Sequence, residues 1–160
     1  MDQLTIVTQI AVAQWELHVK RGTQMITQLS DEALTRAIAP GKNPGTYVVG
    51  HLIAVHDAMP SILGLGDAKY PELYEMYVKQ PDGAAGDPRP VQELRDLWTE
   101  THERVTNLLK NLYANDWLLR HNAMTDEDFA ANPQRNRLSV LLNRTAHFSY
   151  HIGQLRLLNP

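Results

Sequence analysis

The sequence predicts an all-α protein, a four-helix bundle, on three observations. Apolar residues recur with the 3.6-residue period of an amphipathic helix in four long segments. The segments between them are rich in Gly, Pro and Asn, which interrupt helices. The chain has 160 residues, 43% of them hydrophobic, which is enough for one packed core. We therefore expect a single domain over residues 1–160, with four helices around that core.

The first two predicted helices lie in the N-terminal part of the chain. The first spans residues 4–29, and Ser30 can then cap a short turn that reaches Ala37. The Pro-Gly and Asn-Pro dipeptides of residues 40–45 predict a loop. The second helix is predicted over residues 46–63, where a proline at position 60 would kink or shorten it.

A long connection rich in glycine and proline is predicted over residues 64–90, with a short helix at 72–79. The third long helix follows over residues 91–113, and Glu93 near its start suits the positive end of the helix dipole. A connection of this length can run back along a helix, so the second and third helices can be parallel. Up-down-down-up order is therefore as compatible with the sequence as simple up-and-down order.

The C-terminal part of the chain predicts a second long connection and the last helix. The connection covers residues 115–136, with an ordered turn at 125–130. Residues 113–121 are expected to be partly extended. The fourth helix is predicted over residues 138–158, where leucine, isoleucine and phenylalanine share one broad face.

Composition and charge exclude several classes of function. The formal net charge of −3 gives no overall basic surface for nucleic acid. The absence of cysteine excludes disulfides, thiolate metal ligands and a cysteine nucleophile. The N-terminal residues lack the pattern of a signal peptide, and no apolar run is long enough to span a membrane. We therefore expect a cytoplasmic protein that binds neither nucleic acid nor membranes.

Two histidines in the fourth predicted helix suggest a metal site. His147 and His151 are four residues apart, so their imidazoles share one helix face about one turn apart. Such a pair can bind one metal ion if a third ligand arrives from elsewhere. The alternative interpretation is a pair of solvated or hydrogen-bonded imidazoles without a metal.

The residues around this pair argue against two familiar kinds of metal chemistry. A zinc protease of the HExxH type has Glu after the first histidine as general base, and here that position is Phe148. Di-iron bundles require several inward carboxylates, but residues 138–158 contain no Asp or Glu. The chain also contains neither a GxxxxGK phosphate loop nor a Gly-x-Ser-x-Gly nucleophile motif.

The second predicted helix offers the best third ligand, His51. It lies in an otherwise apolar run, and Gly50 beside it allows a close helix approach. His56 is five positions further on, about 140° around the helix, so it should not face the same ion. Asp57 is either an acceptor that orients a ligand imidazole or a solvated carboxylate. His18 in the first helix can also approach the bundle interior.

Further pocket residues are suggested by their place near these histidines. Asn143 and Gln154 lie on the same face as the pair, one turn to either side, and Gln154 can hydrogen-bond a ligand imidazole. Tyr47 and Trp15 can line a pocket near His51. Two other histidines are expected on solvated surface, His102 and His121.

The motifs Gly50-His51-Leu52, His56-Asp57 and His147-x-x-x-His151-x-Gly153-Gln154 together resemble the DinB-like (YfiT-like) superfamily. The resemblance extends over nearly the whole chain. It implies an up-down-down-up four-helix bundle in which His51, His147 and His151 hold a divalent metal. Zinc, nickel or iron would suit three imidazoles. The resemblance also implies a homodimer and a link to the stress response to DNA damage, without implying DNA binding.

Characterised relatives include metal-dependent transferases and isomerases that use a low-molecular-weight thiol such as bacillithiol or mycothiol. The resemblance therefore implies a transferase that activates a thiol cosubstrate for attack on a small electrophile. Two alternatives remain open. Metal-dependent hydrolysis of a small molecule would need a general base, for which His56, Asp57 and His18 are candidates. A non-catalytic metal-binding or sensing dimer would need none.

Overall fold

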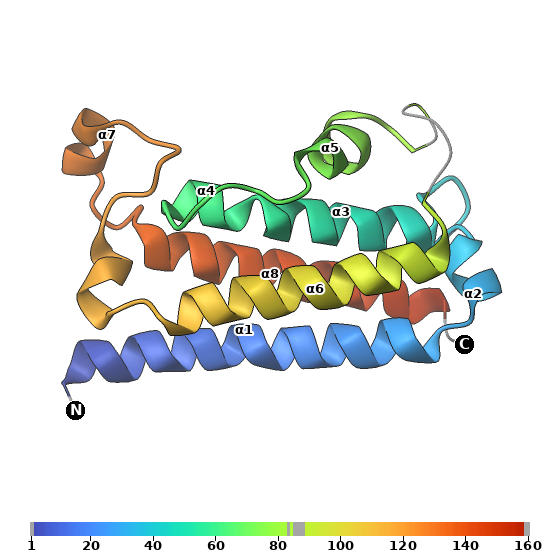
Figure 1. Cartoon of the computed structure of the whole chain (residues 1–160), viewed down its shortest axis with the longest axis horizontal. Coiled ribbons are helices and arrows are strands. Elements are labelled where there is room, and N and C mark those ends of the chain that lie inside the picture. The colour runs from blue at the N-terminus through green and yellow to red at the C-terminus, as the bar shows by residue number, and fades with distance from the viewer. Residues whose placement is uncertain (1, 83, 85–88, 159–160) are drawn as a thin grey trace.

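Four long helices lie side by side in the computed structural model, which describes residues 2–82, 84 and 89–158 (Figure 1). They are α1(Gln3–Gln28), α3(Gly45–Asp57), α6(Val91–Lys110) and α8(Arg137–Leu155). In Figure 1, α1 and α8 run from left to right, whereas α3 and α6 run from right to left. Helix α1 packs on α8 and α6, and α3 packs on α6 and α8. The described residues contain no β-strand, which confirms the predicted all-α class.

Short helices occupy the connections between the long ones. Helix α5 and the π-helix η1 that continues it pack on α3 (Figure 1). Residues 83 and 85–88 of the predicted connection at 64–90 lie outside the described residues. The short elements are α2(Asp31–Thr35), α4(Met59–Leu63), α5(Pro71–Tyr74), η1(Glu75–Lys79), the 3₁₀-helix η2(Ala114–Leu118), α7(Asp126–Ala131) and the 3₁₀-turn η3(Arg156–Leu158).

Capping side chains begin several of these helices. The carboxylate of Asp2 accepts a hydrogen bond from the backbone N–H of Thr5 at 2.9 Å, at the start of α1. Asn136 caps α8 in the same way, and Ser30 caps α2, as its sequence predicts. These caps satisfy backbone donors that have no partner within the helix.

The predicted helix over residues 46–63 is two helices. Helix α3 ends at Asp57, and α4 begins at Met59. Pro60 has no backbone N–H to donate, and its ring crowds the carbonyl four residues earlier, so the series of helical backbone hydrogen bonds is interrupted here. Helix α4 ends at Leu63 and is followed by Gly64, whose φ of 70° is the left-handed conformation that glycine adopts without strain.

Two other local predictions are confirmed in part. Residues 113–121 are extended at Tyr113 and Leu119, but 114–118 between them form the 3₁₀-helix η2. The predicted helix at 72–79 is α-helical only to Tyr74 and continues as a π-helix. The alternation of polar and apolar side chains does not distinguish an α-helix from these tighter or wider turns.

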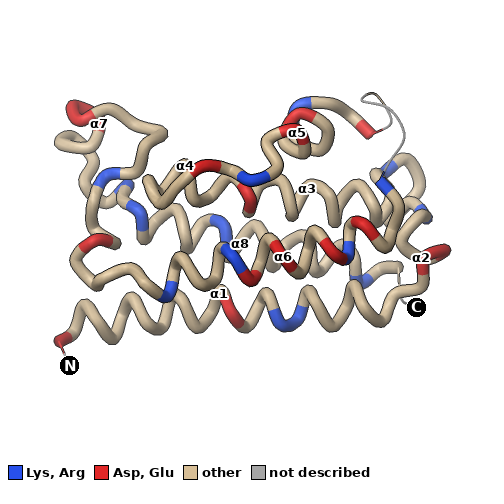
Figure 2. Tube along the Cα trace, in the orientation of Figure 1, with Lys and Arg blue, Asp and Glu red and all other residues tan. Residues whose placement is uncertain are grey.

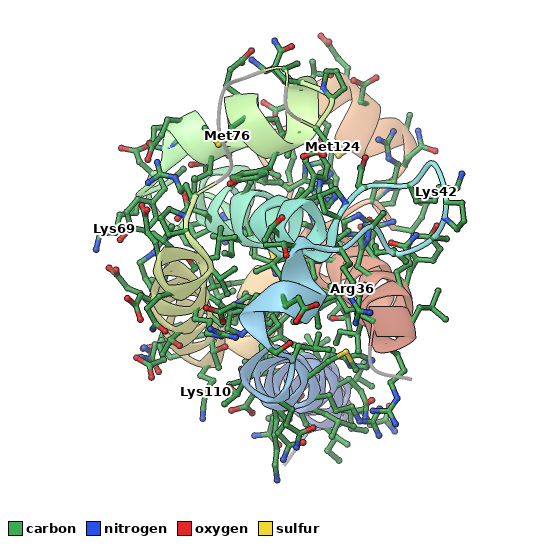
Figure 3. All side chains as sticks on the ribbon, turned by 90° about the vertical axis from the view of Figure 1, so that its right-hand side faces the viewer. Arg36, Lys42, Lys69, Met76, Lys110 and Met124 are labelled. Atoms are coloured by element: carbon green, nitrogen blue, oxygen red, sulfur yellow. The ribbon has the colours of Figure 1, made fainter. Side chains whose placement is uncertain are left out.

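The core lies between the four long helices, which Figure 3 shows nearly end-on. It contains several large aromatic side chains. Trp15, Trp98 and Phe148 are fully buried. Each indole N–H has a partner, because Trp15 donates to Thr106 Oγ1 and Trp98 to Thr23 Oγ1, both at 2.9 Å. Both bonds join α1 to α6 and remove the cost of burying an unpaired indole donor.

The surface carries both signs of charge. Basic and acidic residues are interspersed over the elements (Figure 2). Within the described ranges, none of the helices has both the length and the apolar character needed to cross a bilayer.

Candidate metal centre

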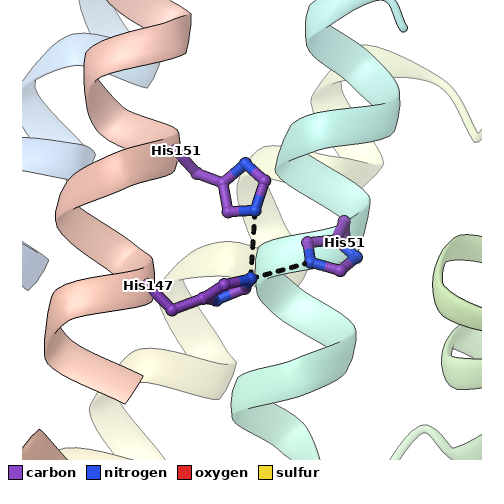
Figure 4. A group of neighbouring side chains, drawn as sticks. All are labelled: His51, His147 and His151. Carbon is purple, nitrogen blue, oxygen red and sulfur yellow. Dashed lines mark hydrogen bonds between the residues drawn. The ribbon is translucent and has the colours of Figure 1, made fainter. Parts of the chain in front are cut away.

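Three histidines converge between α3 and α8 (Figure 4). His147 and His151 come from successive turns of α8, and His51 comes from the facing side of α3. The Nε2 atom of His147 lies 3.2 Å from Nε2 of His51 and 3.0 Å from Nε2 of His151. The structure thus brings the three predicted ligands together through the same ring atom.

The second ring nitrogen of two of these histidines is occupied by an acceptor. His51 Nδ1 donates to the backbone carbonyl of Tyr77 at 2.9 Å, and His151 Nδ1 donates to Gln154 Oε1 at 2.7 Å. In a neutral imidazole with its proton on Nδ1, Nε2 carries the lone pair. Two of the three converging nitrogens are therefore acceptors, and only His147 has a hydrogen to offer them. The Nδ1 atom of His147 is buried without a hydrogen-bond partner among the described residues.

Gly50 and the π-helix η1 place the carbonyl that holds His51. A Cβ atom at position 50 would lie 2.6 Å from the ring of Tyr77, so only glycine lets this ring lie directly on α3. The close approach predicted at Gly50 is therefore to Tyr77 and not to a neighbouring long helix. Because the Tyr77 ring is buried and its hydroxyl accepts from the backbone N–H of Arg89, the carbonyl of Tyr77 is held in place.

All three imidazoles are neutral at pH 7. Burial lowers the pKa of His147 to about 4, and the neighbouring His151 and His51 contribute to this lowering. Burial also lowers the pKa of His51 and of His151, against the opposing effect of the Tyr77 and Gln154 hydrogen bonds. Metal ligands must be unprotonated, so these shifts favour a metal over protons.

A cavity of about 570 Å³ opens beside the triad, between the loop at residues 38–43 and the C-terminal end of α8. His51 and His151 form part of its wall, together with Tyr47 and Gln154. Tyr47 is fixed by donating its hydroxyl to the carbonyl of Gln80 at 2.7 Å. This volume is that of a small-molecule site.

The donor set fits a divalent transition metal. Nitrogen–nitrogen separations of 3.0 and 3.2 Å suit an ion that lies about 2.0–2.1 Å from each nitrogen. A cation would satisfy all three lone pairs, which a single hydrogen from His147 cannot do. Hydrogen-bonded Nδ1 atoms are the usual support of metal-binding histidines. Three protein ligands also leave room for a further ligand, as catalytic sites require.

The other residues predicted for the site divide into two groups. Gln154 contacts His151, and Tyr47 lies on the cavity wall, so the structure brings both to the triad. It does not bring Trp15 or Asn143 there. Trp15 is buried against the aromatic core, and Asn143 is exposed on α8 away from the cavity wall.

His56 and Asp57 are both buried, and each has partners outside the triad. Asp57 is neither solvated nor bonded to a ligand imidazole, because it pairs with Arg104 at 2.6 Å and accepts the backbone N–H of Tyr70 at 2.8 Å. His56 Nδ1 contacts Nε2 of His102 at 2.9 Å. Because His102 Nδ1 donates to the Trp98 carbonyl, His102 Nε2 is the acceptor of this pair.

The expectation that His102 and His121 are exposed is wrong. Their exposed fractions are 1% and 7%. The ring of His102 contacts that of Trp98 in a tilted arrangement, with ring centroids 4.0 Å apart, and His121 accepts the backbone N–H of Ala123. His18 is partly buried and donates to the carbonyl of Gln14 within α1.

Sequence reasoning did not find three residues close to the triad. Tyr77 contributes a backbone carbonyl, which no side-chain pattern reveals. Tyr150 accepts a hydrogen bond from the amide of Gln154 at 3.0 Å and so fixes the oxygen that His151 uses. Arg144 lies on the same face of α8, and its spacing of three residues from His147 was a usable signal.

Comparison with known proteins identifies a family for most of the chain. The model of the DinB superfamily matches residues 14–155, which include all three histidines of the triad. Among curated proteins, no match was found.

Proposed function

Because this chain belongs to the DinB superfamily, we propose that it is an up-down-down-up four-helix bundle that holds a divalent metal through His51, His147 and His151. The superfamily is a metal-binding one. One observation carries the proposal: the Nε2 atoms of His51 and His151 lie 3.2 Å and 3.0 Å from Nε2 of His147. Zinc, nickel and iron all suit three imidazoles.

We propose further that the site is a transferase centre for a low-molecular-weight thiol. The chain has no cysteine, so the thiol must be a cosubstrate. A divalent metal held by three neutral imidazoles supplies Lewis acidity, which lowers the pKa of a bound thiol. In the reaction, the sulfur forms a bond to an electrophilic carbon, the leaving group departs with its bonding electrons, and the thiol proton goes to solvent.

The residues of the protein position the imidazoles and line the cavity beside them. Tyr77 and Gln154 fix two of the imidazoles and keep their lone pairs directed at one point. Tyr47 and Tyr150 line the cavity where the cosubstrate and the electrophile would meet. Hydrolysis receives less support, because His56 and Asp57 are engaged elsewhere and no carboxylate is among the described residues of the cavity wall.

The proposal also includes a homodimer, a cytoplasmic location and a role in the stress response. The homodimer and the stress response rest on the resemblance of the sequence motifs, and the location is the expectation stated in the sequence analysis.

Elemental analysis of protein purified without an affinity tag tests the metal site. We expect close to one equivalent of a divalent metal in the parent and almost none in His51→Ala. The matched control is His18→Ala, a partly buried histidine that bonds only within its own helix, and it should keep the metal. Equal metal content in all three proteins would remove His51 from the site.

A second assay tests the reaction. Metal-loaded protein is mixed with small electrophiles and each of the common cellular thiols, and consumption of the electrophile is followed. We expect thiol-dependent turnover that disappears in His147→Ala. Turnover with water alone would indicate hydrolysis, and no turnover with any thiol would leave a non-catalytic metal protein.

A further inference from the structure

Arg144 stands on the same face of α8 as two histidines of the triad. It precedes His147 by three residues and His151 by seven, which is about one and two turns of helix. Arg144 is partly buried, yet its guanidinium takes part in none of the ion pairs formed by the described residues. A charge removed from water in this way is costly unless something compensates it.

Other partly buried arginines do have such compensation. Arg104 pairs with Asp57, and Arg95 pairs with Asp31, each at 2.6 Å. Arg89 and Arg120 also contact carboxylates. Among the partly buried arginines of the described residues, Arg144 and Arg137 are the two without an ion pair, and of these Arg144 is the one on the face of α8 that carries the triad histidines.

The charge of Arg144 acts directly on the triad. It lowers the pKa of His147 on its own helix and of His51 on the facing helix, in addition to the larger effect of burial. Burial lowers the pKa of the Arg144 guanidinium, and Tyr74 of α5 opposes this effect. By its spacing, Arg144 lies on the face of α8 that carries His147 and His151.

No carboxylate of the described residues pairs with this cation. Helix α8 contains no Asp or Glu, and the wall of the neighbouring cavity, which includes His51 and His151 but not Arg144, has none among its described residues. The wall does contain Lys42, on the loop at the edge of the bundle beside α8 (Figure 3). The nearby acid Asp82 raises the pKa of Tyr47, a residue of this wall, in addition to the larger effect of burial. Two cations flanking neutral imidazoles favour an anionic ligand.

We propose that Arg144 binds an oxyanion group, a carboxylate or a phosphate, of the molecule that reacts at the triad. The planar guanidinium fork matches two oxygens of such a group and would hold it about one helix turn from His147. The inference rests on the proposed function and adds to it a substrate class, a small acid.

Two thiols of equal length test this inference by calorimetry on the zinc-loaded protein. One is 3-mercaptopropionate, and the other is 3-mercaptopropan-1-ol, which lacks the carboxylate. We expect the parent to prefer the acid, and Arg144→Gln to reduce that preference by about tenfold or more, the usual effect of losing a hydrogen bond between charged groups. The matched control is Arg137→Gln, a partly buried arginine at the far end of α8 without an ion pair among the described residues. It should keep the preference of the parent.

The possible results distinguish failure of the inference about Arg144 from failure of the proposed thiol function. If both thiols bind and the preference is the same in Arg144→Gln and Arg137→Gln, the inference is overturned and the thiol function stands. If neither thiol binds, the thiol function is overturned, and titrations with acetate and with inorganic phosphate decide the inference. Loss of either anion in Arg144→Gln supports it and identifies the group, whereas unchanged or undetectable binding of both overturns it. Should Arg144→Gln lose zinc, Arg144→Met, which also lacks the charge, replaces it, and a preference equal to that of the parent then overturns the inference.

Discussion

Gly50→Ala is the substitution that most directly couples the fold to the triad. The added Cβ would lie 2.6–2.7 Å from three atoms of the buried Tyr77 ring, closer than real Cβ contacts. Overpacking of this kind costs about 1–3 kcal/mol. The change also gives about 1 kcal/mol of helix propensity, since alanine replaces glycine inside α3. The net effect on stability is therefore small to moderate, and a control is needed to isolate the clash.

Gly153→Ala provides that control. Gly153 lies inside α8, and apart from its chain neighbours and the surrounding backbone of its own helix no atom of the described residues would come within 4 Å of a methyl group added there, so alanine should bring the propensity gain alone. We expect the two variants to differ by about 1–3 kcal/mol in the free energy of unfolding by urea, with Gly50→Ala the less stable.

The same variants report on the metal. Displacement of Tyr77 removes the carbonyl that orients His51, and loss of such support reduces metal affinity by about 10- to 100-fold. Competition with a chelating dye measures zinc affinity in both variants. Equal unfolding free energies and equal zinc affinities would refute the role assigned to Gly50.

Three further predictions concern buried polar groups. Burial lowers the pKa of His102 from 6.5 to about 4. His102 is therefore protonated below pH 6.5 in the unfolded chain, but only near pH 4 in the folded protein. The free energy of unfolding should be unaffected by this group above pH 6.5 and should fall by roughly 3 kcal/mol towards pH 4. Urea unfolding at about pH 7 and about pH 4.5 should show a smaller fall in the free energy of unfolding for His102→Gln than for the parent, and an equal fall would contradict this. Gln154→Leu leaves Nδ1 of His151 without its acceptor and should weaken zinc binding about tenfold, whereas Gln154→Glu should not; dye competition decides. Asp57→Asn breaks the ion pair with Arg104 and should destabilise the protein by about 2–3 kcal/mol, less than for a fully buried pair because Arg104 is partly exposed. Elemental analysis should show an unchanged metal content in this variant. Loss of metal would instead connect Asp57 to the triad.

The sequence predicted the long helices because their apolar faces persist over many turns. It located the ends of α6 and α8 only to within about three residues, since frayed turns and 3₁₀-turns keep the same side-chain pattern. The split at Pro60 followed from the chemistry of proline, and the structure places it within two residues of that position.

The three triad residues were also found from sequence, by helical spacing for His147 and His151 and by apolar context for His51. His102 was misplaced because charged neighbours obscured its register. It follows Trp98 by four residues and precedes Val105 by three, so it lies on the buried face of α6. The carbonyl of Tyr77 belongs to a π-helix, and no pattern of side chains predicts such a turn.

The distance along the chain between the ligands has a consequence for how the protein folds. His147 and His151 share one helix, whereas His51 is 96 residues before His147. Closing a loop of this length costs the unfolded chain entropy, so a metal that bridges both ends acts as a cross-link in a protein without disulfides. The unfolded chain retains at most the weak two-histidine half of the site. The protein should therefore bind metal with full affinity only at the end of folding, when α8 docks on α3.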